Sequence, residues 1–318
     1  MDGPVAGWAC AQKMLCDGTS SGFTAECNAP VTMAHFLASF IGVAFAIATL
    51  VLLSLGLAII YGMMGVINLA QGEFIMLGAY TVVFSSAHGL NLWIGMVLAP
   101  AVVGLVGLVV ERCVIRFLYG RLLDTMLATW GLSLGLIAAV TLILGPSTEG
   151  VATPLGHVAI GNYTVAGYNL FVIAAAAASV ALTWYIFNYT KFGLVARGAM
   201  QNAEMVAALG IHPPTIYMVT FAFGSALAGL AGAIMAPLTG VVPSLGLAFV
   251  AKVFITVTVG GAAVFAGTLS AGALLGTIES AVSFVSTPIY GQVAMLGCAL
   301  ILLRIAPQGV AGLWRRRG

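Results

Sequence analysis

The sequence predicts an all-α polytopic membrane protein with about eight to nine transmembrane helices. Of its 318 residues, 61% are hydrophobic and only 6% are charged, whereas an ordinary soluble domain carries about 25% charged residues. The mean hydropathy is +1.12. The apolar stretches are continuous and long enough for helices that cross a bilayer. A transmembrane barrel would instead alternate apolar and polar residues.

We divide the chain into three parts: an extramembrane head at 1–33, a transmembrane domain at 34–306 and a basic tail at 307–318. The head lacks the basic start and clean apolar core of a signal peptide. If it lies outside the cytoplasm, two of its three cysteines could form a disulfide. The sequence leaves this pairing open; the three residues are Cys10, Cys16 and Cys27.

Turns, glycines and prolines divide the transmembrane domain into nine apolar segments. The expected segments are about 34–60, 72–86, 92–110, 123–144, 168–189, 215–236, 247–259, 267–284 and 290–303. An odd number of crossings places the N-terminus outside. One short segment could instead be re-entrant, and the N-terminus would then lie inside.

Basic residues set the orientation, because short loops rich in Lys and Arg stay in the cytoplasm. The turn after the third segment carries Arg112, Arg116 and Arg121, and the chain ends with three arginines at 315–317. Both are therefore expected inside. The long loop at 145–167 has one acidic residue and no Lys or Arg, which fits the outside.

Polar residues gather at membrane depth in the stretch YGMMGVINLAQGEFIMLGAY, residues 61–80. Asn68, Gln71 and Glu73 lie there among several glycines. Polar groups in hydrocarbon are costly unless they face protein or water. We expect these side chains to line or shape a solute pathway, together with Thr129 and Trp130 of the fourth segment. The alternative is that they only join two helices by hydrogen bonds.

Two further features lie in the apolar segments. Pairs of glycines four residues apart, which let helices approach closely, occur at 131 and 135 and at 272 and 276. Lys252 and Glu279 could form an ion pair between the seventh and eighth segments, or could line the pathway. Lys252 could also extend to the membrane interface.

Residues 192–212 form a polar segment with a helical pattern and are too polar to span. The segment ends at Gly210, shortly before Pro213-Pro214, which is a helix stop. A short amphipathic helix on the basic side is either a docking surface or a helix that rests on the membrane.

The sequence contains no recognisable catalytic, metal-binding or phosphate-binding motif. The four histidines are scattered, and we find no metal-ligand spacing, nucleophile turn or phosphate loop. The sequence has no basic face of the kind that binds nucleic acid. We therefore expect no catalytic residue, metal or cofactor, and any ATP hydrolysis would come from another subunit.

The 61–80 stretch resembles the signature of permease subunits of the branched-chain amino acid class of bacterial ABC importers, usually close to YG-x-x-G-x-INxAHGE-x-x-MxGAY. Gln71 stands where that family usually has His. The runs at 111–134 and 197–211 extend the similarity, which covers about residue 36 to the end. Within the class, the LYGR and LATWG runs at 118–121 and 127–131 and the Met-Gln-Asn run at 200–202 look more like the urea permease branch.

The resemblance implies a type II ABC importer permease in the bacterial inner membrane, with a cytoplasmic C-terminus. Its partners would be a second homologous permease, two cytoplasmic ATPases, a periplasmic solute-binding protein and the lipid bilayer. The segment at 192–212 would be the coupling helix. By similarity to the family's E-A-A-x-x-x-G loop, the residues expected at the ATPase are Arg197, Gln201, Asn202, Glu204 and Gly210.

The expected function is transport of a small polar solute, urea or a short amide, by alternating access. The alternative substrate is a branched-chain amino acid. A stand-alone channel or secondary transporter is the alternative of another class, and a membrane enzyme comes third because its motifs are missing. A channel would have no use for a docking helix, which separates these readings.

Overall fold

The computed structural model describes residues 33–154, 156–160, 163–261, 264–306 and 309. Most of the expected head and tail therefore lie outside the described residues. The first half of the described chain forms α2 (Met33–Met64), α3 (Gln71–Ala87), α4 (Leu92–Cys113), the 3₁₀ helix η1 (Ile115–Leu118), α5 (Leu122–Leu144), β1 (His157–Ile160) and β2 (Tyr163–Ala166). The second half forms α6 (Gly167–Tyr189), α7 (Lys191–Gln201), α8 (Ala203–Ala208), α9 (Pro213–Met235), α10 (Leu245–Gly260), α11 (Val264–Val285) and α12 (Pro288–Ile305).

The expected fold class is confirmed. Seven of the described helices are long and apolar enough to cross a membrane: α2, α4, α5, α6, α9, α11 and α12. Two shorter helices, α3 with 17 residues and α10 with 16, coincide with the second and seventh expected segments. At 1.5 Å per residue each is about 25 Å long, less than the roughly 30 Å of a bilayer core.

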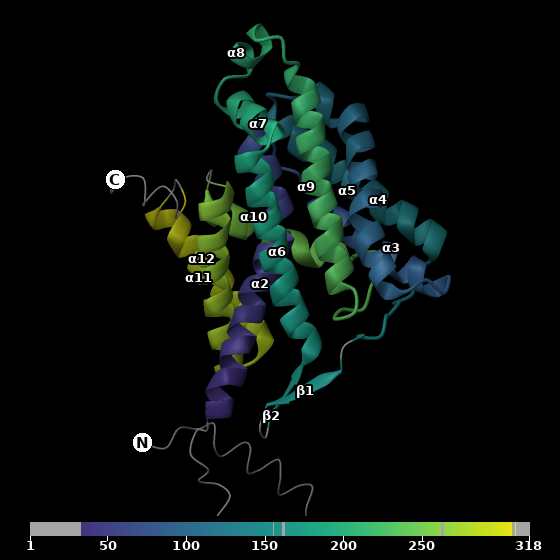
Figure 1. Cartoon of the computed structure of the whole chain (residues 1–318), viewed down its shortest axis with the longest axis vertical. Coiled ribbons are helices and arrows are strands. Elements are labelled where there is room, and N and C mark those ends of the chain that lie inside the picture. The colour runs from purple at the N-terminus through teal and green to yellow at the C-terminus, as the bar shows by residue number, and fades with distance from the viewer. Residues whose placement is uncertain (1–32, 155, 161–162, 262–263, 307–308, 310–318) are drawn as a thin grey trace, which may run out of the picture.

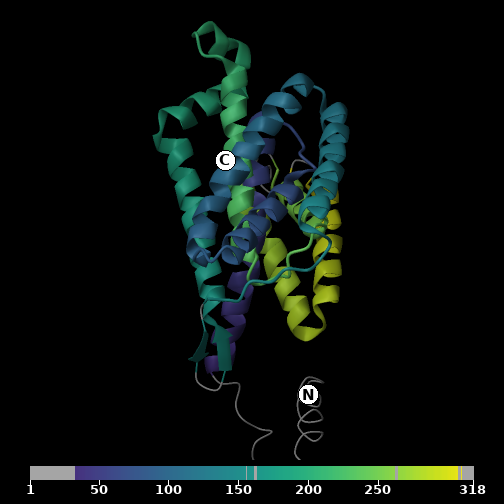
Figure 2. The same ribbon diagram turned by 90° about the vertical axis from the view of Figure 1, so that its right-hand side faces the viewer.

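The bundle is organised around α2 and α9. Helix α9 packs against α4, α3 and α2, and α2 also contacts α11, α6 and α10. Helices α5 and α12 are the least covered, with 17% of their apolar windows buried, against 67% for α2 and α9. Figure 2 shows α12, in yellow, at the outer edge.

The two ends of the bundle differ. Helices α7 and α8 project at one end, and the β1–β2 hairpin lies at the other (Figure 1, Figure 2). The basic turn between α4 and α5 belongs to the α7 end, because α5 runs from it to the loop before the hairpin. Glu149 in that loop pairs with Val241 after α9. The basic turn and the 145–167 loop thus lie at opposite ends, as expected, but the hairpin within that loop was not predicted.

The glycine pairs behave differently from each other. A Cβ at Gly276 would lie 2.9 Å from Ile47 Cα, and one at Gly272 would lie 2.6 Å from a methyl group of Val51, so this pair brings α11 onto α2. A Cβ at Gly131 or Gly135 would meet nothing within 4 Å. Within the described chain the second pair brings no helix close, because this face of α5 is exposed.

Candidate functional site

The polar stretch lies where the chain breaks between α2 and α3. Gly65 ends α2 with φ +63°, a left-handed conformation that favours glycine. In the irregular segment that follows, Asn68 Oδ1 accepts a hydrogen bond from the Ala70 amide at 3.0 Å, and its Nδ2 donates to Gln71 Oε1 at 3.4 Å. Asn68 therefore shapes the turn that starts α3.

A second set of contacts joins this break to α5. The Leu69 amide donates to Thr129 Oγ1 at 3.2 Å, and Ser133 Oγ donates to Glu73 Oε1 at 2.9 Å. Thr129 and Ser133 are one turn apart, so they present one polar stripe of α5 to the break. Ser133 was not in the expected set, although its spacing from Thr129 could have indicated it.

Glu73 also lies against the start of α10. A Cβ at Gly246 would lie only 2.6 Å from Glu73 Oε2, and a Cβ at Gly72 would lie 2.2 Å from the Gly246 carbonyl oxygen. Only residues without a side chain allow the two helix starts to meet so closely. Helix N-termini favour a negative charge. Glu73 Oε2 has no hydrogen-bond partner among the described residues.

We call Asn68, Gln71, Glu73, Thr129 and Ser133 the polar cluster. Each of its side chains is at most 1% exposed. The cluster is therefore closed to solute in this conformation, and its contacts join α3, α5 and the break. Trp130 lies apart from it: its side chain is 46% exposed because it follows Thr129 by about 100° around the helix.

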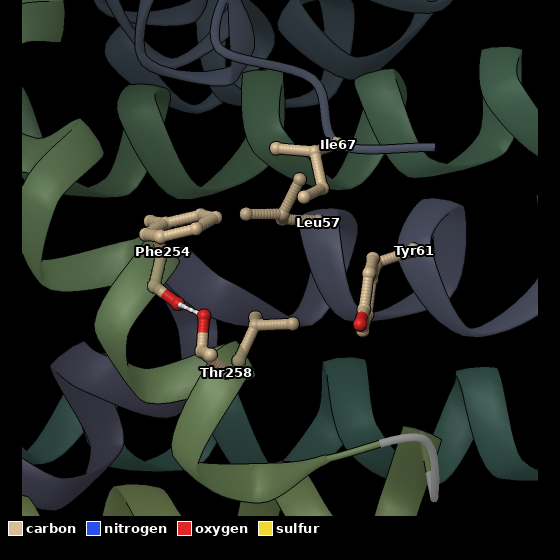
Figure 3. A pocket seen from close by; sticks show the side chains of 6 residues that line it. Leu57, Tyr61, Ile67, Phe254 and Thr258 are labelled. Atoms are coloured by element: carbon tan, nitrogen blue, oxygen red, sulfur yellow. Dashed lines mark hydrogen bonds between the residues drawn. The ribbon is translucent and has the colours of Figure 1, made fainter. Parts of the chain in front are cut away.

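A small pocket lies between α2, the break and α10 (Figure 3). It is mostly apolar and has a volume of about 40 Å³, enough for a water molecule but far below the roughly 300 Å³ of the smallest ligand pockets. Its lining consists of Leu57, Tyr61, Ile67, Phe254, Val257 and Thr258. The Thr258 hydroxyl is used within its own helix, donating to the Phe254 carbonyl at 2.7 Å.

The expected ion pair is present. Lys252 Nζ of α10 donates to Glu279 Oε1 of α11 at 2.6 Å. The two side chains keep 23% and 16% of their surfaces exposed, unlike those of the polar cluster.

The segment expected to couple to an ATPase consists of two helices. Asn202 has an extended backbone, and its Oδ1 accepts the Met205 amide at 3.0 Å, so it ends α7 and caps α8. Arg197 donates to Asn188 Oδ1 of α6 at 3.3 Å. Gly210 has φ +83° and follows the end of α8. Gln201 and Glu204 are exposed.

The same element carries exposed apolar side chains that we did not single out from the sequence. Their exposed fractions run from 45% to 74%. We call Leu194, Met200, Met205 and Leu209 the apolar patch of α7–α8. Apolar residues within a polar helix were the available signal.

Taken together, the fold defines a helical membrane protein with a broken span and a projecting amphipathic element. The chain belongs to the family described as "Branched-chain amino acid transport system / permease component", which matches residues 39–303. Members of this family are membrane subunits of transporters rather than enzymes.

Three relatives show the extent of the similarity. The permease protein LivH of Escherichia coli K12 is 27% identical over 287 residues, covering 83% of this chain and 92% of that protein. BraD of Pseudomonas aeruginosa is 28% identical, with 87% and 96% covered. The probable LivH of Methanocaldococcus jannaschii is 28% identical, with 84% and 90% covered. All three are named for branched-chain amino acid transport, and no solved structure matches the chain.

Proposed function

We propose that this chain is a permease subunit of an ABC importer that moves branched-chain amino acids across the bacterial inner membrane. The family match across 39–303 carries this proposal. The names of the relatives favour branched-chain amino acids over urea and short amides, which the sequence motifs had suggested. A stand-alone channel is disfavoured, because it would leave the α7–α8 element without a role.

The ATPases would dock on α7 and α8. These helices project from one end of the bundle (Figure 1) and present the apolar patch to solvent. Exposed apolar patches are typical of surfaces that contact another protein or the membrane, and we propose the first for this element. Gln201 and Glu204 are exposed and adjoin Met200 and Met205 in the sequence, so they would provide polar contacts. Asn202 and Gly210 would act through the backbone, by capping and ending α8.

A movement of α7 could be transmitted to the rest of the bundle through packed side chains. Helix α7 contacts α6, α9 and α2. Ala196 of α7 shares an apolar core with Phe187 of α6, Ile59 and Met63 of α2 and Leu227 of α9. Helix α2 then ends at the break that holds the polar cluster. ATP-driven closure of two ATPases would move α7 and α8, and so change which side of the pathway is open.

The second permease would cover the exposed sides of α5 and α12. Both present large apolar side chains with little cover, such as Leu142 at 86% exposure and Leu300 at 70%. The relative LivM of Salmonella typhimurium, 26% identical, illustrates a second permease of this kind. A periplasmic protein would deliver the solute at the hairpin end. Trp130, on the exposed side of α5, would face the pathway between the two permeases.

The test is uptake of radiolabelled leucine by cells that express the complete transporter. Replacing Arg197 and Glu204 together by Ala should abolish ATP-dependent uptake while membrane insertion stays normal. The matched control is Lys191→Ala, which removes an exposed charge at the start of α7 and should transport normally. Unchanged uptake in the double variant contradicts the coupling role. If urea inhibits uptake and isoleucine and valine do not, the substrate is urea rather than a branched-chain amino acid.

A further inference from the structure

The Lys252–Glu279 ion pair joins α10 to α11 within the helical bundle. Glu279 is 15 residues after the start of α11 at Val264 and six before its end at Val285, so it lies about 22 Å along a helix about 33 Å long. Lys252 is the eighth of the 16 residues of α10. The 2.6 Å bond places both charges at one level of the bundle, and because α11 runs toward the hairpin end (Figure 1), the pair lies nearer that end.

The pair differs from the polar cluster in access. Lys252 and Glu279 keep 23% and 16% of their side-chain surfaces exposed, whereas the cluster residues keep 1% or less. The positions near Lys252 on α10 include Ala248 and Ala251, which are exposed and have small side chains. Charges at this depth are costly against lipid, so this face is suited to water, solute or a partner subunit.

Both charges retain unused bonding capacity. A lysine ammonium has three donors and a carboxylate has two oxygens. Within the described residues, the side-chain hydrogen bond that these groups make is the one from Nζ to Oε1. A second anion could therefore bind Nζ, and a second cation could bind the free oxygen, without breaking the pair.

We propose that Lys252 and Glu279 form a binding station for the zwitterionic backbone of an amino acid in transit. The solute carboxylate would bind the Lys252 ammonium, and the solute ammonium would bind the Glu279 carboxylate. The four charges would alternate in sign, which compensates the loss of water around each. This inference rests on the proposed function and deepens it: an uncharged solute such as urea would gain much less from two opposite charges.

The main experiment replaces the pair by apolar residues of similar length in the complete transporter. Exchanging a partly buried ion pair for apolar side chains is often neutral or stabilising for the fold. Lys252→Met combined with Glu279→Met should therefore assemble with the partner subunits, while leucine uptake falls at least about tenfold, the effect of roughly 1.4 kcal/mol. A double variant that assembles and transports leucine like the wild type overturns the station and leaves a purely structural pair.

A second measurement keeps both charges and applies if the double variant does not assemble. In a transporter without its native cysteines, Ala251→Cys should react with a water-soluble thiol reagent, and leucine should slow that reaction several-fold. Val253→Cys, whose native side chain is 1% exposed, is the matched control and should react slowly. An unreactive thiol at 251, or a rate that leucine does not change, overturns the station.

The two proposals fail separately. A wild-type transporter that takes up no branched-chain amino acid overturns the proposed function, and the station with it. Normal wild-type uptake together with an unaffected double methionine variant overturns the station alone.

Discussion

Ser133 Oγ lies 2.9 Å from Glu73 Oε1 and donates to it across 60 residues of sequence. The bond matters because α5 has few other attachments: among the described elements it packs chiefly against η1 and α3. Among the described residues, the hydrogen bond from the Leu69 amide to Thr129 Oγ1 is the other one that joins α5 to the break and the start of α3. The position of α5 is therefore set largely by the polar cluster.

Removing the hydroxyl of Ser133 should loosen α5. Ser133→Ala deletes the hydrogen bond that Glu73 Oε1 accepts, and the other carboxylate oxygen already has no partner among the described residues. We expect a loss of about 1–3 kcal/mol, measured as a lower unfolding temperature in detergent. Thr277→Ala is the control, because in the described part of the chain that hydroxyl bonds the Ala273 carbonyl of its own helix and no other group. Equal unfolding temperatures for the two variants would contradict this role.

The helices themselves could be predicted closely from the sequence. The expected segment at 123–144 is α5 at Leu122–Leu144, and that at 168–189 is α6 at Gly167–Tyr189. Glycine, proline and polar residues punctuate long apolar runs, and the bilayer fixes their length. The hairpin was missed, although the Gly-Asn pair at 161–162 between two short runs is a hairpin signal.

The site could be predicted only in part. Asn68, Gln71 and Glu73 share one short stretch, so their proximity was readable. Their burial was not, because a polar side chain at membrane depth gives the same pattern whether it faces solute or another helix. Trp130 is adjacent to Thr129 in sequence but lies on another side of α5. The contact of Glu73 with Gly246 joins segments that are far apart in the sequence. It could therefore be found only from the three-dimensional structure.

A methyl group at Gly232 should separate α3 from α9. A Cβ there would lie 1.8 Å from the Ile75 carbonyl oxygen. Because that oxygen belongs to the backbone of α3, the clash can be relieved only by shifting a whole helix. Gly232→Ala should therefore sharply reduce the amount of folded protein, measured by size-exclusion chromatography of a fluorescent fusion. Gly131→Ala has open space around its Cβ and should be neutral or slightly stabilising. Normal yields of the Gly232 variant would show that the helices pack less closely.

A charge in the apolar patch should release the ATPases. Leu209 is 74% exposed at the end of α8, so Leu209→Glu leaves the fold of the permease intact. If the patch docks as proposed, burying this carboxylate without a partner costs several kcal/mol. The ATPase subunits should then fail to copurify. Lys191→Glu places a carboxylate at an exposed position at the start of α7, outside the apolar patch, and should retain them. Copurification of both variants alike would place the docking surface elsewhere.

Tyr119, in the turn between α4 and α5, donates a hydrogen bond to the buried Glu111 carboxylate. Burial, and then the bond to Glu111, raises the pKa of Tyr119 above its ordinary value of 10. The folded chain therefore holds the phenol proton more tightly than the unfolded chain does. The resulting stability is fully present below about pH 10 and is lost only as the pH rises further. Tyr119→Phe keeps the ring, which packs edge-on at 5.3 Å from Tyr217, and should cost about 1–3 kcal/mol. Unfolding temperatures should show the same gap from wild type at about pH 6 and 9. If the difference in unfolding temperature disappears between these two pH values, the hydrogen bond is lost at a lower pH than expected.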